Sequence, residues 1–227
     1  MTRLVGMSTD HALQPVLTER TTPYAGPATP VVLTAAVAAG VVLGVVDLWW
    51  STYHPSAWSS VANSCAGWAA CAFALGAALR VDALRAAVAA VVMLAVAVEA
   101  YYLAEVVLQA GDRWILTSPV AMEWLVLAGV AGALYGPAGA WAAGRSPWRA
   151  AVGLAVGGSL LLGDALQLAG RDLALAGSGE PRVLVLLALA MLACSVRRPW
   201  VAVAALVLSL PLSLVVAAAF VSTGVYM

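Results

Sequence analysis

Seven apolar segments, each separated from the next by a short polar stretch, dominate this sequence from residue 31 onward. They are predicted at residues 31–50, 57–79, 86–109, 118–142, 149–170, 182–196 and 199–224. A helix of ~20 apolar residues crosses about 30 Å of hydrocarbon, and most of these segments reach that length. Because 63% of the residues are hydrophobic and only 10% are charged, no water-soluble core could bury this much apolar surface. The sequence therefore predicts an all-α integral membrane protein with a single bundle of seven transmembrane helices.

The basic residues predict how this bundle is oriented. All 11 are arginines, and the chain contains no lysine. With a cytoplasmic amino terminus, the inner side would carry Arg3, Arg20, Arg80, Arg85, Arg145, Arg149, Arg197 and Arg198, and the outer side Arg113, Arg171 and Arg182. Cytoplasmic segments of membrane proteins carry an excess of basic residues. We therefore expect the amino terminus inside and the carboxyl terminus outside.

Two parts of the chain need separate comment. Residues 1–29 are polar and irregular, and they lack the short apolar run and cleavage site of a signal peptide. We expect a disordered or surface-lying cytoplasmic tail there, followed by a transmembrane domain over residues 30–227. The sixth segment has only fourteen residues between Arg182 and Arg197, roughly 21 Å of helix. It can still span if both arginines snorkel or the bilayer thins locally.

The composition excludes several classes of function. Without lysine there is no Schiff base to retinal or pyridoxal phosphate and no lysine-bearing phosphate loop. The two histidines lie outside the apolar segments, and the three cysteines lack metal-ligand spacing. A formal charge of zero gives nucleic acid no basic patch to bind. We expect no metal, no cofactor and no nucleic-acid partner, and a multi-pass protein of a bacterial inner (cell) membrane whose partners are the bilayer and a lipophilic small molecule.

Five carboxylates fall inside the predicted spans, where charge is costly. They are Asp47, Glu99, Glu105, Glu123 and Asp164. Each would cost on the order of 2.5–3.5 kcal/mol at the bilayer centre, so five acids facing lipid are not credible. In the predicted orientation Glu99 lies near the midplane and the other four lie in the outer half. We expect them to face the bundle interior, a water-filled cavity or the interface.

Helical spacing predicts that several of these acids share a cavity in the outer half. Asp47 lies on one face with Gly40 and Gly44, and Asp164 lies on one face with Gly153 and Gly157. We predict Glu99, Asp47 and Asp164 as catalytic residues, with Glu99 as the proton donor because it is deepest. The residues predicted to bind substrate are Trp50, Asn63, Tyr102, Glu105, Glu123, Trp124 and Gln167. Structural hydrogen bonding by the three acids, and interfacial or helix-terminal roles for Glu105 and Glu123, remain open alternatives.

Several stretches resemble an uncharacterised family of small bacterial integral membrane proteins. The matching residues are Trp58, Ala62-Asn63-Ser64, Trp68, Ala72-Phe73, Gly76-Ala77, Tyr101-Tyr102, Glu105, Pro119, Trp124 and the run from Tyr135-Gly136-Pro137 through Trp141. Asp164 stands where glutamate is expected. The likeness covers roughly residues 31–200, and it implies an architecture but no activity.

The organisation of the chain is also similar to that of the integral-membrane terpene cyclases, including bacterial ones acting on farnesylated indoles. No motif matches residue by residue. The likeness implies cyclisation of a prenyl chain by protonation, without a metal. That chemistry needs a neutral carboxylic acid in an apolar site and aromatic rings near the resulting cation. The alternatives are a proton-coupled carrier or binder of a small cationic or amphipathic molecule, and a non-catalytic membrane subunit.

Overall fold

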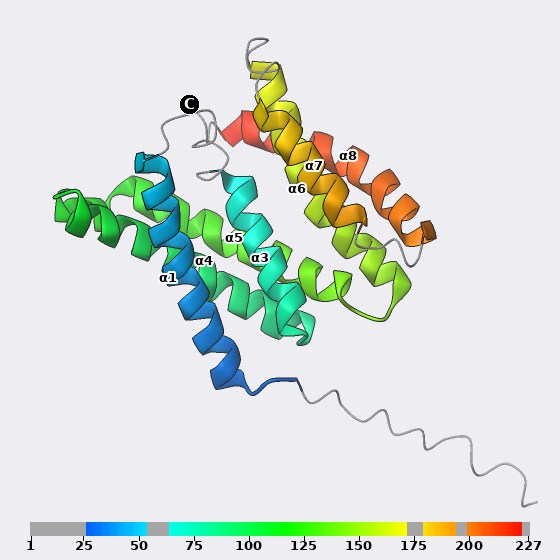
Figure 1. Ribbon diagram of the computed structural model, residues 1–227, viewed down its shortest axis with the longest axis horizontal. Coiled ribbons are helices and arrows are strands. Elements are labelled where there is room, and N and C mark those ends of the chain that lie inside the picture. Colours follow the sequence, from blue (N-terminus) through cyan, green and yellow to red (C-terminus); the bar gives the residue numbers. More distant parts are fainter. Residues whose placement is uncertain (1–25, 54–63, 172–178, 194–198, 224–227) are drawn as a thin grey trace, which may run out of the picture.

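The computed structural model is all-helical over the residues that it describes, which are 26–53, 64–171, 179–193 and 199–223. Seven α-helices and one 3₁₀ helix follow one another along this part of the chain (Figure 1). They are α1 (Thr29–Tyr53), α3 (Cys65–Leu79), α4 (Ala83–Leu108), η1 (Arg113–Thr117), α5 (Pro119–Ala142), α6 (Pro147–Arg171), α7 (Gly179–Ala193) and α8 (Pro199–Thr223). Each α-helix overlaps one apolar segment of the sequence, so the all-α prediction is confirmed.

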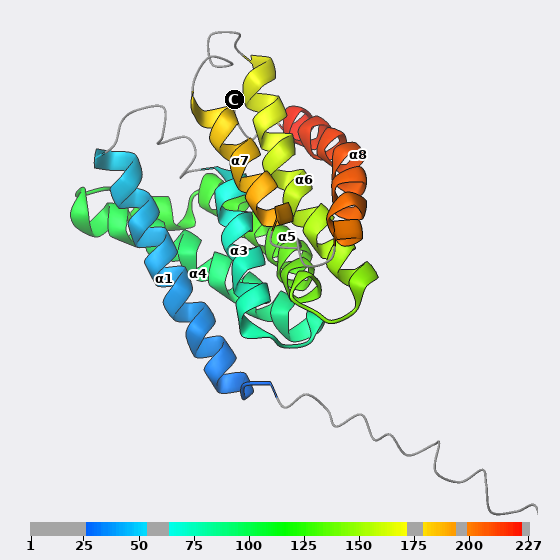
Figure 2. The ribbon, with the colours of Figure 1, turned by 45° about the vertical axis from the view of Figure 1, so that its right-hand side comes forward.

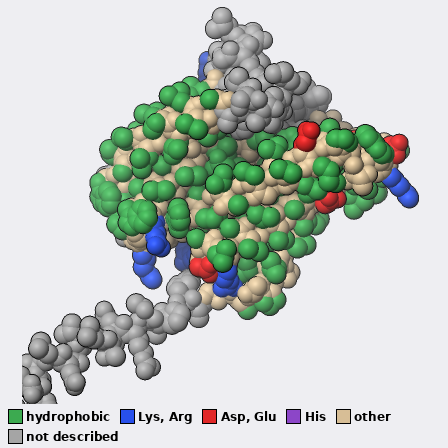
Figure 3. Space-filling model, turned by 180° about the vertical axis from the view of Figure 1, so that it is seen from behind, with side chains coloured by type: hydrophobic (Ala, Val, Ile, Leu, Met, Phe, Trp, Pro, Cys, Tyr) green, Lys and Arg blue, Asp and Glu red, His purple; other side chains and the backbone are tan. Residues whose placement is uncertain are grey.

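Four helices are long and apolar enough to cross a membrane. They are α1, α4, α5 and the part of α6 from Pro147 to Leu166. Within the described residues, α3 and the Trp200–Val216 part of α8 are apolar but shorter. One face of the molecule is covered mostly by apolar side chains, with arginines near its edges (Figure 3). These features are those of a membrane protein.

Glycine backbones bring the helices into close contact and reveal their relative directions. A Cβ added to Gly40 would lie 2.4 Å from the carbonyl oxygen of Met93, and one added to Gly44 would lie 2.2 Å from that of Ala97. Because both residue numbers rise together, α1 and α4 are parallel. Contacts between helices in lipid depend on such small residues, since lipid provides no hydrophobic driving force between apolar helices.

Helix α5 makes similar contacts with two neighbours. A Cβ on Gly132 would lie 2.5 Å from the backbone nitrogen of Val91, and one on Gly136 would lie 2.5 Å from the carbonyl oxygen of Ala86. The opposite numbering makes α4 and α5 antiparallel. A Cβ on Gly76 would lie 2.0 Å from the carbonyl oxygen of Gly136, so α3 also contacts α5 backbone to backbone. Figure 2 shows α3 between α1 on one side and α6 to α8 on the other.

Helix boundaries depart from the apolar segments where capping residues intervene. The second segment was expected to begin at residue 57, but α3 begins at Cys65 because Ser64 caps it, accepting a hydrogen bond from the Gly67 backbone nitrogen at 2.9 Å. Ser118 caps α5 in the same way, with 3.2 Å to the Ala121 nitrogen. Hydropathy alone does not detect such caps. The predicted tail over residues 1–29 lies outside the described residues except for its last four.

Replacing Gly132 by alanine is expected to lower the free energy of unfolding by about 1–3 kcal/mol, because the new methyl group would collide with the α4 backbone. Gly129→Ala, on the same helix, is the matched control, since no atom lies within 4 Å of its added Cβ. Melting temperatures of the purified protein in detergent provide the measurement. Equal melting temperatures for the two variants would contradict the close α4–α5 contact.

Candidate functional site

Asp47 is buried near the end of α1 and accepts a hydrogen bond from a tryptophan on another helix. Its side chain is 4% exposed, and its Oδ2 lies 3.1 Å from Nε1 of Trp68 on α3. The close approach of α1 to α4 at Gly44, one turn earlier, brings this carboxylate into the bundle. A buried carboxylate needs such a donor, because burying an unpartnered polar group costs about 1–3 kcal/mol. The prediction that Asp47 faces inward is therefore confirmed.

Trp68 also lines a small cavity that contains a second acid. This cavity has a volume of about 150 Å³ and lies between α3, α4 and α5. Its lining residues are Trp68, Val98, Tyr101, Tyr102, Glu105 and Trp124. We call it the acidic cavity. Of the predicted substrate-binding residues, it brings together Tyr102, Glu105 and Trp124.

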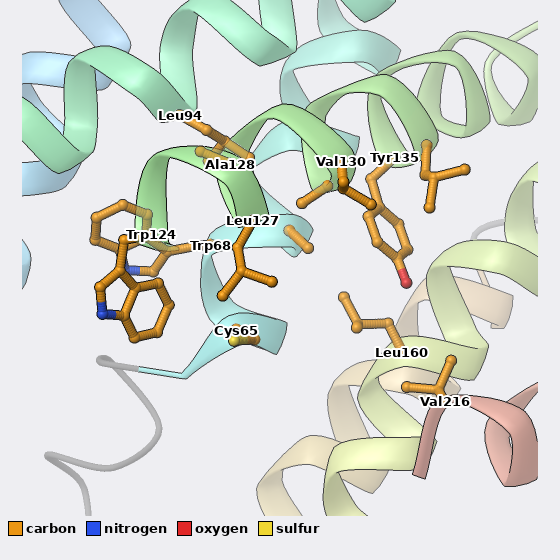
Figure 4. A pocket seen from close by; sticks show the side chains of 13 residues that line it. Cys65, Trp68, Leu94, Trp124, Leu127, Ala128, Val130, Tyr135, Leu160 and Val216 are labelled. Atoms are coloured by element: carbon orange, nitrogen blue, oxygen red, sulfur yellow. The ribbon is translucent and has the colours of Figure 1, made fainter. Parts of the chain in front are cut away.

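A larger and almost wholly apolar cavity begins at the same two tryptophans. Its volume is about 230 Å³, and α3, α4, α5, α6 and α8 contribute to its walls (Figure 4). Figure 4 shows Trp68 and Trp124 together at one end of this apolar cavity and Tyr135 toward the other, with Leu160 and Val216 nearby. Cys65 and Leu127 lie between these ends. Its walls offer few polar partners, so it suits a hydrocarbon.

The rings of Trp68 and Trp124 therefore line both cavities. The ring centroids of Trp68 and Trp124 lie 6.2 Å apart, tilted by 37°. Tyr101 and Tyr102 form an edge-to-face pair with centroids 5.4 Å apart. Such ring faces attract a positive charge, each by about 0.5–2 kcal/mol. The arrangement combines a carboxyl group, aromatic faces and an apolar chamber on one set of helices.

The predicted convergence of Asp47, Glu99 and Asp164 is wrong. Glu99 is exposed on α4 and lines neither cavity. Asp164 is 1% exposed on α6, but α6 packs against α5, α7 and α8, whereas α1 packs mainly against α4 among the described residues. Helix α3 lies between them (Figure 1). Periodicity gives the face of one helix but not its neighbours.

Two further predicted residues lie outside both cavities, and the structure does not describe the remaining two. Glu123 is exposed on α5, so it is not part of either cavity. Trp50 is half-buried near the end of α1 and lines neither cavity. Asn63 and the side chain of Gln167 lie outside the described residues.

Comparison with known families places the chain in one family. A model described as a family of unknown function, DUF6518, matches residues 22–226. The chain belongs to the DUF6518 family. No curated protein and no solved structure was found to match it. All helices that line the two cavities fall inside the range matched by DUF6518, and the resemblance to an uncharacterised family is confirmed.

The sequence prediction of the site in this DUF6518 member missed two important residues, Trp68 and Tyr101. Both are among the residues that resemble the uncharacterised family, yet neither was predicted to be part of the site. A signal was present for Trp68, because it follows Ser64 by four residues and is the one large side chain in the first half of α3, a helix rich in alanine. Its partner on α1 is 21 residues away in sequence, so only the fold identifies the hydrogen bond.

Trp68→Phe is expected to destabilise the DUF6518 protein by about 1–3 kcal/mol, because it removes the donor to the buried Asp47 while keeping an aromatic ring. Trp124→Phe is the control, since it shortens the partner ring of the same pair without touching that hydrogen bond. Chemical denaturation in detergent gives both values. The double variant Asp47→Leu/Trp68→Phe should lose less stability than the sum of its single changes, and strict additivity would contradict a direct interaction.

Proposed function

We propose that this protein is a membrane-embedded enzyme that cyclises a lipophilic prenyl chain by proton transfer from a carboxylic acid. The observation that supports the proposal is the junction at Trp68 and Trp124, where a cavity containing Glu105 adjoins an apolar cavity. Together the two volumes reach the lower part of the ~300–1,000 Å³ range of small-molecule sites. A chain of isoprene units would occupy the apolar cavity and present one double bond to the acid.

Glu105 replaces Glu99 as the proposed proton donor, because Glu105 lines the acidic cavity and Glu99 is exposed elsewhere. In the proposed reaction the protonated carboxyl group transfers its proton to one carbon of a double bond, leaving a tertiary cation. An internal double bond then attacks that cation and forms the new carbon–carbon bond. Loss of a proton from the cyclised cation to the carboxylate restores the acid, so the reaction is an isomerisation that needs no oxidant or metal.

The aromatic residues would stabilise the cation while it exists. Trp68, Trp124 and Tyr102 line the acidic cavity. Their ring faces would stabilise the cation by cation–π interaction. Asp47 does not line either cavity, so it serves as a positioning residue that holds the indole of Trp68. The bilayer gives a lipophilic substrate access to the apolar cavity without crossing water.

We also propose that all seven described helices span the membrane, with the amino terminus inside and the carboxyl terminus outside. The parallel α1 and α4, and the antiparallel α4 and α5, agree with alternating spans. Arg80, Arg85, Arg145 and Arg149 lie at the ends of helices that this topology assigns to the cytoplasmic side. The cavities would then open in the outer half.

Single cysteines test this topology in a variant from which Cys65, Cys71 and Cys194 have been removed. A membrane-impermeant maleimide should label Gly111→Cys in intact cells, because this residue precedes η1 on the proposed outer side. Ser146→Cys, between α5 and α6, should be labelled only after the cells are opened. A cysteine added after Met227 should be labelled in intact cells, and its protection would contradict seven spans.

An isotope experiment tests the catalytic proposal. The purified protein in lipid vesicles is incubated in D₂O with farnesylindole and geranylgeraniol, and the products are analysed by mass spectrometry. Protonation by an exchanged carboxyl group should add one deuterium on carbon to each cyclised product. Glu105→Gln should lower the rate by at least 100-fold, because general-acid catalysis contributes about 10²–10⁴-fold.

Glu99→Gln is the matched control, since it removes an exposed carboxylate from the same helix and should leave the rate unchanged. Equal losses in both variants, or full activity in Glu105→Gln, would contradict the role of Glu105. Saturable binding of the prenyl compounds without a product would favour the alternative, a binder or carrier of a lipophilic molecule. If neither binding nor a product is detected, both the enzyme and the binder or carrier of a lipophilic molecule are excluded.

A further inference from the structure

A pocket at the opposite end of the bundle from Asp47 contains two arginines and no carboxylate among its lining residues. It has a volume of about 420 Å³, and its walls are Arg80, Val81, Ala140, Ala143, Gly144 and Arg145. Arg80 ends α3 in the left-handed conformation, with φ of 50°, and Arg145 follows the end of α5. Two arginines beside small apolar residues suit a phosphate attached to an apolar body.

Among the residues that the structure describes, arginines outnumber acids near this pocket. Asp82 is the nearest acid in sequence, but its Oδ1 accepts hydrogen bonds from the backbone nitrogens of Leu84 and Arg85, both at 3.1 Å, as the cap of α4. Arg85 donates to the carbonyl oxygen of Pro27 and so fastens the start of α1 to α4. Arg149, in the first turn of α6, adds a further positive charge near this end of the bundle.

Neighbouring residues favour a lipid over a soluble anion. Trp148 is 59% exposed, and the guanidinium of Arg149 lies 5.6 Å from its ring centroid. Exposed tryptophan and arginine at a helix end are typical of the membrane–water interface, where lipid headgroups lie. Val81, Ala140 and Ala143 offer apolar surface beside the arginines, which a free phosphate would not use.

We propose that this pocket binds the phosphate headgroup of an anionic phospholipid, with Arg80 and Arg145 contacting the phosphate oxygens. Basic pockets between transmembrane helices bind such headgroups. Guanidinium groups suit this role because they donate several hydrogen bonds to one phosphate. The proposal requires only that this end of the bundle lies at a membrane surface, and it does not depend on the proposed catalysis.

Native mass spectrometry of the full chain, released from detergent with dioleoylphosphatidylglycerol or dioleoylphosphatidylcholine, tests the proposal. The wild-type protein should bind phosphatidylglycerol at least tenfold more tightly than phosphatidylcholine. Arg80→Gln and Arg145→Gln should each weaken the binding of phosphatidylglycerol about fivefold, which is the effect expected of one arginine near an anionic headgroup. Arg113→Gln is the matched control, because Arg113 is an exposed arginine on η1, outside the pocket.

Ala143→Trp provides an independent variant that fills the pocket while keeping both arginines. It should also weaken the binding of phosphatidylglycerol. Circular dichroism and size-exclusion chromatography identify any variant that does not fold. The lipid binding of the folded variants then decides the proposal. No preference between the two lipids, or an equal loss in Arg113→Gln, would overturn the proposal. If millimolar inorganic phosphate competes for the pocket as strongly as phosphatidylglycerol does, the pocket binds a free anion. That result would also overturn the proposal.

Discussion

Backbone contact through glycine is the constraint on which the rest of this bundle depends. Apolar helices in lipid gain nothing from the hydrophobic effect when they meet, so their contact relies on close packing. Helix α5 supplies it on two sides, because Gly132 and Gly136 contact α4, while Gly136 also meets α3 at Gly76. Any side chain at these positions would push the helices apart, and the cavities between them would change shape.

The same contacts explain where the cavities lie. Helices α3 and α5 are parallel and touch in their carboxyl-terminal halves, where a Cβ on Gly139 would lie 2.0 Å from the carbonyl oxygen of Phe73. In their amino-terminal halves the residues between them are Trp68 and Trp124, which are far larger than glycine. Small residues thus lie between the helices at one end, and two indoles lie between them at the other. The acidic cavity lies at the end with the indoles, and the apolar cavity runs from these indoles to Tyr135.

Much of the architecture could be predicted from the sequence, because apolar segments reflect the length that a membrane requires. The site was only partly predictable. Asp47 is buried as expected, because its face follows from its spacing to Gly40 and Gly44. The outward position of Glu99 could not be predicted, since all faces of α4 are similarly apolar and periodicity cannot say which one meets a neighbour. The separation of Asp47 from Asp164 depends on helix order, which no local pattern encodes.

The two ends of α3 and α5 differ in charge, and this matters for the proposed chemistry. Arg80 lies twelve residues after Trp68 on α3, about 18 Å along the helix axis. At that distance its guanidinium cannot form an ion pair with Asp47 or Glu105. A nearby arginine would favour the ionised carboxylate, whereas an acid that donates a proton to an alkene must first be neutral. Because Arg80 and Arg145 lie at the opposite ends of α3 and α5, neither guanidinium stabilises the ionised form of Asp47 or Glu105.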